Sequence, residues 1–427
     1  MSTTASVAPQ AANSYAVSLG ILCLAGFVTT VDRVAFPVVI EPIRRELLLT
    51  DTQLGLLTGL AYSAMYALAS LPVARWADVG DRRTIIALSL SIWSIMTAMC
   101  GFAQSVWQLF LARFGVGFGE AGSNAPVQSL ICEYYPPERR SLPLSLFGLG
   151  AAVGGIVGYG LVGFAADRIG WRHALMLSSL PGLLAAAMIR LWVIEPRAPV
   201  STGHAIARRA PLLEIVAELS RKRSFVHVCI AFAIWGLAAS GTGPWLPAFL
   251  MRAHHVSLTQ VGLQLGLVVG ISLCIGLILG GWIGNLLIAR DILWGLRLPA
   301  LGMCLYTVLA IGALLSTSLT AALSLLFVAG CVGGLVVAPL LATVGGLVSS
   351  QGRALSLAVM GLLAALVGSG LGPLAVGLLS DQLRGPFGAE SLRYGLVLMT
   401  ALILWGVLHL HIASKHLHDE FEEAPAI

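Results

Sequence analysis

Apolar runs of about 20 residues recur along this chain from one end to the other, each bounded by charged, proline or turn residues. A run of that length forms a helix that crosses a bilayer, where only helices and closed barrels satisfy their own backbone polar groups. The chain is 57% hydrophobic and only 11% charged over 427 residues, which excludes an ordinary soluble protein. At roughly 35 residues per helix and loop, about 12 spanning helices fit. We therefore expect an all-α membrane protein.

The apolar runs form two sets separated by a polar, basic segment. The first set lies near residues 15–40, 52–76, 84–103, 107–134, 141–166 and 173–194. The second lies near 225–250, 259–286, 293–316, 320–348, 354–380 and 391–413. This pattern predicts an N-terminal six-helix bundle (1–194), a cytoplasmic linker (195–224), a C-terminal six-helix bundle (225–413) and a cytoplasmic tail (414–427).

The distribution of Lys and Arg predicts the orientation, because cytoplasmic loops of membrane proteins carry an excess of these residues. The linker holds Arg197, Arg208, Arg209, Arg221, Lys222 and Arg223. Loops on the opposite side together hold Arg44, Arg45, Arg168, Arg172, Arg252, Arg384 and Arg393. Since the loops on the linker side carry more cations in total, we expect both termini in the cytoplasm and the bundle in a bacterial inner membrane.

The two halves of the chain share a weak internal sequence repeat. Thr52-Gln53-Leu54-Gly55 recurs as Thr259-Gln260-Val261-Gly262, and later Arg139 matches Arg353 and Asp167 matches Asp381. Ordered matches of this kind are typical of carriers built from two repeated bundles. The repeat predicts two bundles related by a pseudo-two-fold axis.

Several other classes of function find no support in the sequence. The seven cysteines lie within or at the edges of apolar runs, so we expect neither a disulfide framework nor a metal site. No basic stretch is interleaved with stacking aromatic residues, which argues against nucleic-acid binding. No set of Ser, His and Asp residues is placed to catalyse hydrolysis. Gly117 to Gly122 matches the G-x-G-x-x-G motif of dinucleotide-binding proteins, but it lies inside an apolar helical run and lacks the strand–helix–strand context, so we reject a dinucleotide site. We expect no enzymatic activity and no cofactor.

A loop between the second and third apolar runs carries the first family resemblance. Ala74-Arg75-Trp76-Ala77-Asp78-Val79-Gly80-Asp81-Arg82-Arg83 resembles the G-x-x-x-D-R/K-x-G-R-R/K loop of the major facilitator superfamily. Asp78, Arg82 and Arg83 match that pattern, whereas Ala74, Val79 and Asp81 depart from it. The resemblance implies the major facilitator fold, alternating access, and a conformational latch formed by the three matching residues.

A narrower resemblance covers roughly residues 15 to 380. The motifs that carry it are Asp32-Arg33, Leu111-Ala112-Arg113-Phe114-Gly115-Val116-Gly117-Phe118-Gly119-Glu120-Ala121, Arg139-Arg140-Ser141 and Gly170-Trp171-Arg172. In these motifs the chain is similar to the Spinster-type subfamily, which implies proton-coupled transport of lysolipids.

Independently of family, four ionisable residues lie deep inside apolar runs: Asp32, Arg33, Arg113 and Glu120. A charge at the bilayer centre costs about 2.5 to 3.5 kcal/mol on insertion scales, so such residues usually serve function and face a cavity. Arg113 and Glu120 are seven residues apart, which places them on one helix face about 10 Å apart.

Our hypothesis is that Asp32 and Glu120 carry the coupling proton, while Arg113 tunes Glu120 or binds an anionic headgroup. The alternative is a set of static ion pairs that fix the bundle, and Arg33 fits either role. Asn124 and Tyr62 are expected to add polar groups to the substrate path, although each also suits an interhelical hydrogen bond.

The second half offers mainly Leu, Val, Ala and Gly with a few aromatic residues. Charge in one bundle and an apolar wall in the other suit an amphipathic cargo, so a lysophospholipid or related lipid is the predicted substrate. The alternatives are a proton-linked carrier of small organic anions or drugs and, from another class, a passive lipid scramblase or channel. The expected partners are membrane lipids and the cargo, with the protein as a monomer.

Overall fold

The computed structural model describes residues 9–196, 220–346, 356, 359–417 and 420. Every regular element in these residues is helical. The chain divides into two compact units, one formed by Met1–Phe36 and Ala64–Gly203 and the other by Pro37–Ser63 and His204–Ile427. Most of the predicted linker (195–224) and tail (414–427) lies outside the described residues, and the two-bundle division stays a prediction.

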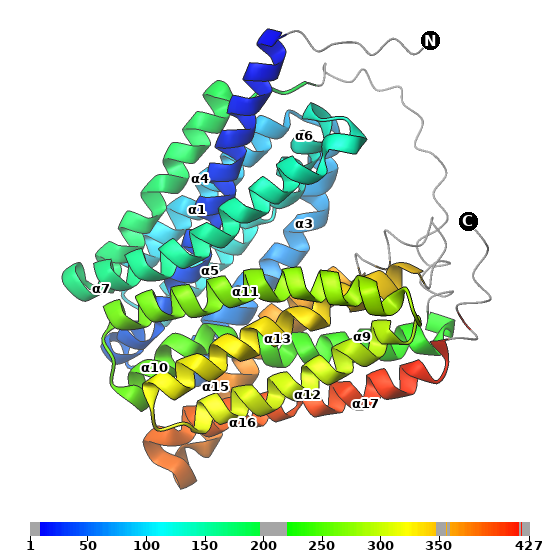
Figure 1. The fold of residues 1–427 in the computed structure, drawn as a ribbon. Coiled ribbons are helices and arrows are strands. Elements are labelled where there is room, and N and C mark those ends of the chain that lie inside the picture. The colour runs from blue at the N-terminus through cyan, green and yellow to red at the C-terminus, as the bar shows by residue number, and fades with distance from the viewer. Residues whose placement is uncertain (1–8, 197–219, 347–355, 357–358, 418–419, 421–427) are drawn as a thin grey trace. The chain divides into compact units, whose positions relative to one another are not determined.

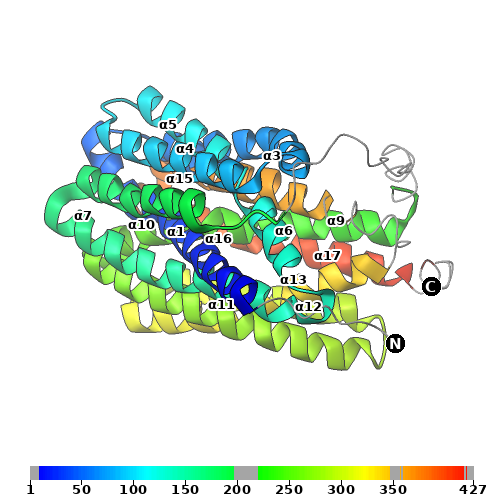
Figure 2. The ribbon, with the colours of Figure 1, turned by 90° about the horizontal axis from the view of Figure 1, so that it is seen from above.

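The first unit is built from long helices of the N-terminal half. α1 (Pro9–Leu47) contributes its part up to Phe36, and α3 (Ala61–Val79) contributes its part from Ala64. The remaining elements are α4 (Arg82–Phe102), α5 (Val106–Glu120), α6 (Asn124–Tyr134), the 3-10 turn η2 (Pro137–Arg139) and α7 (Ser141–Trp192). α4 packs beside both α5 and α7 (Figure 2).

The second unit combines the segment 37–63 with the C-terminal half. That segment contains the end of α1, α2 (Asp51–Gly55) and the π-helical turn η1 (Leu56–Leu60). The other elements are α9 (Arg223–Trp235), η3 (Gly236–Ser240), η4 (Gly243–Trp245), α10 (Leu246–His254), α11 (Leu258–Ile288), α12 (Trp294–Leu315), α13 (Leu319–Gly346), η5 (Ala364–Leu371), α15 (Gly372–Phe387), η6 (Gly388–Glu390), α16 (Ser391–Ala401) and α17 (Ile403–Ser414). α13 packs beside both α11 and α12 (Figure 1), around a core that includes Trp235, Met303 and Val336.

Nine helices among the described residues are long and apolar enough to cross a membrane. Many large apolar side chains on them are exposed, among them Leu191, Ile278 and Val308 at 70%, 72% and 68%. So much exposed apolar surface is stable only against lipid. The expected all-α membrane architecture is confirmed.

The repeated Thr-Gln sequence has a local structural cause. Thr50 and Ser257 each cap a helix, and the side chain of the third residue, Gln53 or Gln260, returns a hydrogen bond to the cap backbone. This reciprocal capping satisfies backbone groups that a helix start leaves open. The duplicated motif therefore marks equivalent helix beginnings at α2 and α11.

One face of α7 approaches α1 through glycines four residues apart. A Cβ placed on Gly154 would lie 2.2 Å from the Phe27 carbonyl oxygen, and one on Gly150 would lie 2.7 Å from that of Cys23. These distances are far below van der Waals contact, so only glycine permits this backbone approach. Further along α7, Gly170 adopts φ 81° and ψ 157° and separates the two apolar runs predicted within this helix.

We expect Gly154→Leu to lower the thermal stability of the detergent-purified protein, because it forces α1 and α7 apart at a cost of about 1–3 kcal/mol. The matched control is Gly148→Leu on the same helix, where an added Cβ meets nothing within 4 Å. Equal melting temperatures for the two variants would contradict this account of the α1–α7 contact.

Candidate coupling site

Asp32 is a buried carboxylate in the middle of α1. Asp32 is only 3% exposed. The hydroxyl Oγ1 of Thr97 on α4 donates a hydrogen bond to Asp32 Oδ2 at 3.0 Å. Within the described residues, Oδ1 has no hydrogen-bond partner. A buried carboxylate oxygen without a donor is costly, and such a group is suited to binding a proton.

Glu120 and Arg33 form an ion pair between α5 and α1. Arg33 Nη2 lies 2.5 Å from Glu120 Oε2. The Glu120 side chain is 1% exposed, whereas that of Arg33 is 48% exposed. The carboxylate is therefore fixed in the interior, and its cationic partner extends to accessible surface.

Arg113 completes the charged group. It is buried on α5, and its guanidinium carbon lies 4.5 Å from the centroid of the Phe36 ring, a cation–π contact. Glu120, Arg113 and Arg33 are the charged groups that act on the Asp32 carboxylate. The Arg33–Glu120 ion pair joins α1 to α5, and the role of Arg113 in tuning Glu120 or binding an anionic headgroup stays a prediction.

The helix that carries these groups is interrupted directly after Glu120. α5 ends there, a turn covers residues 121–123, and α6 begins at Asn124. The span predicted near residues 107–134 therefore consists of two helical segments. The backbone N–H groups of Gly122 and Ser123 bond to carbonyls three residues back, and Ser123 Oγ donates to the Glu120 carbonyl at 3.0 Å. Such a side-chain hydrogen bond competes with the regular helix.

The break changes the setting of Asn124. This residue starts a new helix and is partly buried, so it does not continue the Glu120 face by regular helical spacing. Tyr62 is also partly buried, near the start of α3, and belongs to the other compact unit. The roles of both residues in a substrate path stay predictions.

In the loop that resembles the superfamily motif, Arg82 is the central residue. It is fully buried and bonds to three groups: Glu195, Glu133 at 2.6 Å and Ser129 at 2.9 Å. Arg82 therefore ties the start of α4 to α6 and to the segment after α7. Asp78 is exposed at the end of α3.

Asp81, one of the departures from the motif, caps α4. Its carboxylate accepts hydrogen bonds from the Arg83 backbone and side chain and from Thr84 Oγ1. Partial burial alone would raise the pKa of Asp81, but the hydrogen bonds from Arg83 and Thr84 outweigh it and hold that pKa below its ordinary value. The loop thus gains a helix cap where the motif has glycine.

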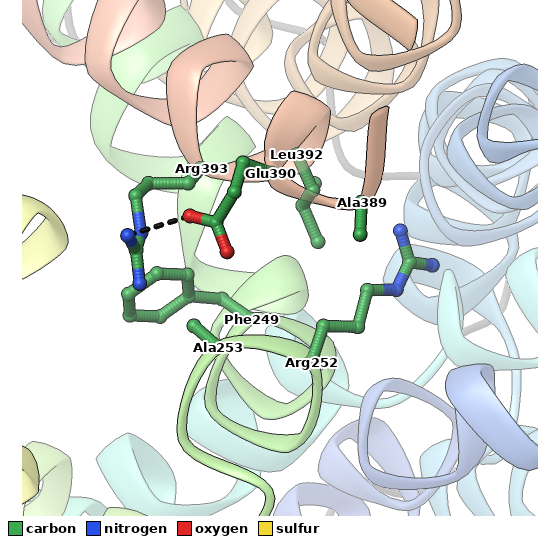
Figure 3. Close-up of a pocket in the computed structure, with 7 residues that line it drawn as sticks. All are labelled: Phe249, Arg252, Ala253, Ala389, Glu390, Leu392 and Arg393. Carbon is green, nitrogen blue, oxygen red and sulfur yellow. Dashed lines mark ion pairs between the residues drawn. The ribbon is translucent and has the colours of Figure 1, made fainter. Parts of the chain in front are cut away.

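A second ionic cluster lies in the other compact unit and was not predicted from the sequence. Arg252 on α10 bonds to both oxygens of Asp51 at 2.8 Å and to Glu41 at 2.7 Å. Ser380 on α15 donates to Asp51 at 2.6 Å. Figure 3 shows Arg252 directed away from the Glu390–Arg393 ion pair nearby.

Glu41 and Asp51 are 1% and 0% exposed, so this cluster is a buried ionic network. The sequence signal was the acidic residue at the end of an apolar run.

Comparison with known proteins places these features in a family. The model of the Major Facilitator Superfamily matches residues 22–373. An MFS-type efflux pump of Mycolicibacterium smegmatis is 32% identical over 412 residues, covering 95% of this chain and 94% of that protein. The sphingosine-1-phosphate transporter SPNS2 of Danio rerio is 26% identical, covering 96% of this chain and 86% of that protein.

A solved structure gives the same result for the fold. The crystal structure of a bacterial homologue of the human lysosomal transporter Spinster, inward-facing and unoccupied, superposes with a TM-score of 0.87 at 27% identity. It covers 99% of this chain and 100% of that chain. The buried charges of α1 and α5 therefore lie in a fold built for secondary transport and not for catalysis, and the chain belongs to the Major Facilitator Superfamily as a Spinster-like transporter.

Proposed function

We propose that this transporter couples proton movement to the movement of a lysophospholipid or related amphipathic lipid by alternating access. The observation that carries the proposal is the group of three buried ionisable side chains, Asp32, Arg113 and Glu120, together with Arg33, which forms an ion pair with Glu120. Ionised groups inside apolar helices are costly, and static ion pairs add little net stability that apolar residues could not supply. Their presence is therefore best explained by function.

Coupling follows from the sharing of Arg33. While Arg33 pairs with Glu120, its guanidinium compensates the charge of the buried carboxylate. When an anionic headgroup attracts Arg33 instead, the buried carboxylate loses its compensating charge and is stabilised by taking up a proton. Asp32 provides a second proton site on the same helix as Arg33, and Arg113 supplies a further cation for the headgroup.

The lipid cargo is supported by the chemistry of a relative. SPNS2 of Danio rerio is named as a transporter of sphingosine 1-phosphate, which joins an anionic headgroup to an apolar tail. The second candidate is efflux of small organic anions or drugs. It is favoured by the mycobacterial relative named as an efflux pump.

The topology that we propose has about 12 spans in two repeated bundles. Ser141–Trp192 and Val359–Ser414 are each too long for one crossing at about 1.5 Å per residue. The pair α5 and α6 supplies another span. Both termini would then lie in the cytoplasm of a bacterial cell, with Asp78, Arg82 and Arg83 forming the latch, Asn124 and Tyr62 lining the path, and the protein acting as a monomer.

Counterflow in proteoliposomes tests the cargo. Vesicles loaded with unlabelled lysophospholipid should transiently accumulate the labelled lipid without any ion gradient, because a carrier exchanges cargo across the membrane. Small organic anions should not compete. Saturable counterflow of an organic anion or drug, without lysolipid counterflow, would favour the second candidate, and flux without acceleration by internal cargo would indicate a passive scramblase.

A further inference from the structure

A pocket of about 440 Å³ in the second compact unit is lined by four arginine side chains among other residues. It lies where α1, α10 and α15 end and where α16 begins. Among its lining residues are four arginines, one histidine and a single carboxylate: Arg44, Arg45, Arg252, Arg384, His255 and Glu41.

The carboxylate of Glu41 is already fully engaged. Its Oε1 accepts hydrogen bonds from Arg44 at 3.0 Å and Arg45 at 2.9 Å. Its Oε2 accepts from Arg44 at 3.1 Å and Arg252 at 2.7 Å. Three guanidinium groups therefore converge on one buried acid, and Arg252 also bonds to a second carboxylate, Asp51.

Arg384 is held loosely on another wall. Its Nη2 lies 3.8 Å from Asp381 Oδ1, and its side chain is 52% exposed. The oxygens of Asp381 instead accept closer hydrogen bonds from the backbone of Asp51 and from the backbone and hydroxyl of Thr52, at 2.7–3.2 Å. Asp381 thus caps α2, and the Arg384 guanidinium remains available to the pocket.

The pocket lining carries more arginines than carboxylates. Even when Asp51 and Asp381 behind the wall are counted with Glu41, the four arginines outnumber the carboxylates. Arg45 is 62% exposed, and its hydrogen bond to Glu41 uses Nε. Arg45 and Arg384 therefore present guanidinium donors to the same space, an arrangement that matches the oxygens of a phosphate group.

We propose that this pocket binds a phosphate-type oxyanion, held between Arg45 and Arg384 with Arg44 behind them. Inorganic phosphate and the headgroup of an anionic phospholipid share this chemistry. In the proposed topology the pocket opens outside the cell, at the opposite end of α1 from the N-terminus. The site is separate from the α1–α5 charges, so it stands or falls independently of the coupling ion and the cargo.

The test is phosphate binding by the purified full-length protein in phosphatidylcholine nanodiscs. Ligand binding to the folded state raises the melting temperature, so phosphate should stabilise the wild type more than chloride at equal ionic strength. The double variant Arg45→Gln and Arg384→Gln should bind phosphate at least about tenfold more weakly, because it loses two charge-assisted contacts. Both side chains are more than half exposed, so the variant should fold.

Arg297→Gln is the matched control, since Arg297 is also an exposed arginine with one carboxylate partner, at 3.2 Å, but lies outside the pocket. It should bind phosphate as the wild type does. Equal phosphate affinity in the wild type and the double variant, or stabilisation no greater than with chloride, would overturn the proposal.

Nanodiscs that also contain phosphatidylglycerol identify the source of the anion. If that headgroup occupies the pocket, it should lower the apparent phosphate affinity of the wild type but not of the double variant. An unchanged affinity for phosphate would assign the site to the free anion.

Discussion

Arg252→Gln should lower the free energy of unfolding by about 3–5 kcal/mol, the usual cost of removing one partner from a buried ion pair. Arg252 is 14% exposed and neutralises Glu41 and Asp51, which are almost completely buried. Without the guanidinium, Asp51 would keep only the Ser380 hydroxyl and the more distant cations as compensation. Denaturant titration of the detergent-purified protein measures the change.

Two further variants make this prediction specific. Arg297→Gln removes an exposed pair and should cost no more than about 1 kcal/mol. Adding Asp51→Asn to Arg252→Gln should recover part of the loss, since it removes the buried carboxylate whose arginine is lost. An Arg252→Gln variant as stable as Arg297→Gln would show that the Glu41–Asp51–Arg252 network does not hold this end of the unit together.

Glu120→Gln should abolish accumulation of cargo against its gradient while leaving exchange of cargo intact. The amide has nearly the shape of the carboxylate but neither ionises nor pairs with Arg33 as an anion. Uptake driven by a pH gradient should therefore stop at the equilibrium level, whereas counterflow, which needs no proton movement, should continue.

The matched control for this prediction is Glu133→Gln. Glu133 also bonds to an arginine in the same compact unit, but Arg82 keeps Glu195 when that bond is lost. We expect this variant to accumulate cargo as the wild type does. A folded Glu120→Gln protein that accumulates cargo to the wild-type level would exclude Glu120 from coupling.

What could be predicted from the sequence was local. Runs of apolar residues determine which segments can cross a bilayer, and the repeat of Thr52-Gln53-Leu54-Gly55 as Thr259-Gln260-Val261-Gly262 shows that the two halves are related. Asp32, Arg33, Arg113 and Glu120 could be found because a charge is conspicuous in an apolar run.

What could not be predicted was the choice of partner. Helical spacing puts Arg113 and Glu120 on one face, but it cannot show that Arg33 of another helix forms an ion pair with Glu120. The Glu41–Asp51–Arg252 network joins residues about 200 positions apart, and no periodic pattern carries that information. At the helix break after Glu120, a serine hydroxyl and two backbone N–H groups bond to carbonyls three residues back. A count of apolar residues does not reveal these hydrogen bonds.

The most direct test of proton-coupled lipid transport is uptake of labelled lysophospholipid into proteoliposomes with and without an imposed pH gradient, for the wild type and Asp32→Asn. Asp32 is buried against Thr97 and within the field of Glu120, Arg113 and Arg33. We expect saturable, gradient-dependent uptake by the wild type and none above equilibrium by the variant. Equal gradient-driven uptake by both folded proteins would contradict the coupling role of Asp32, and the absence of wild-type uptake in either gradient direction would contradict the lipid cargo.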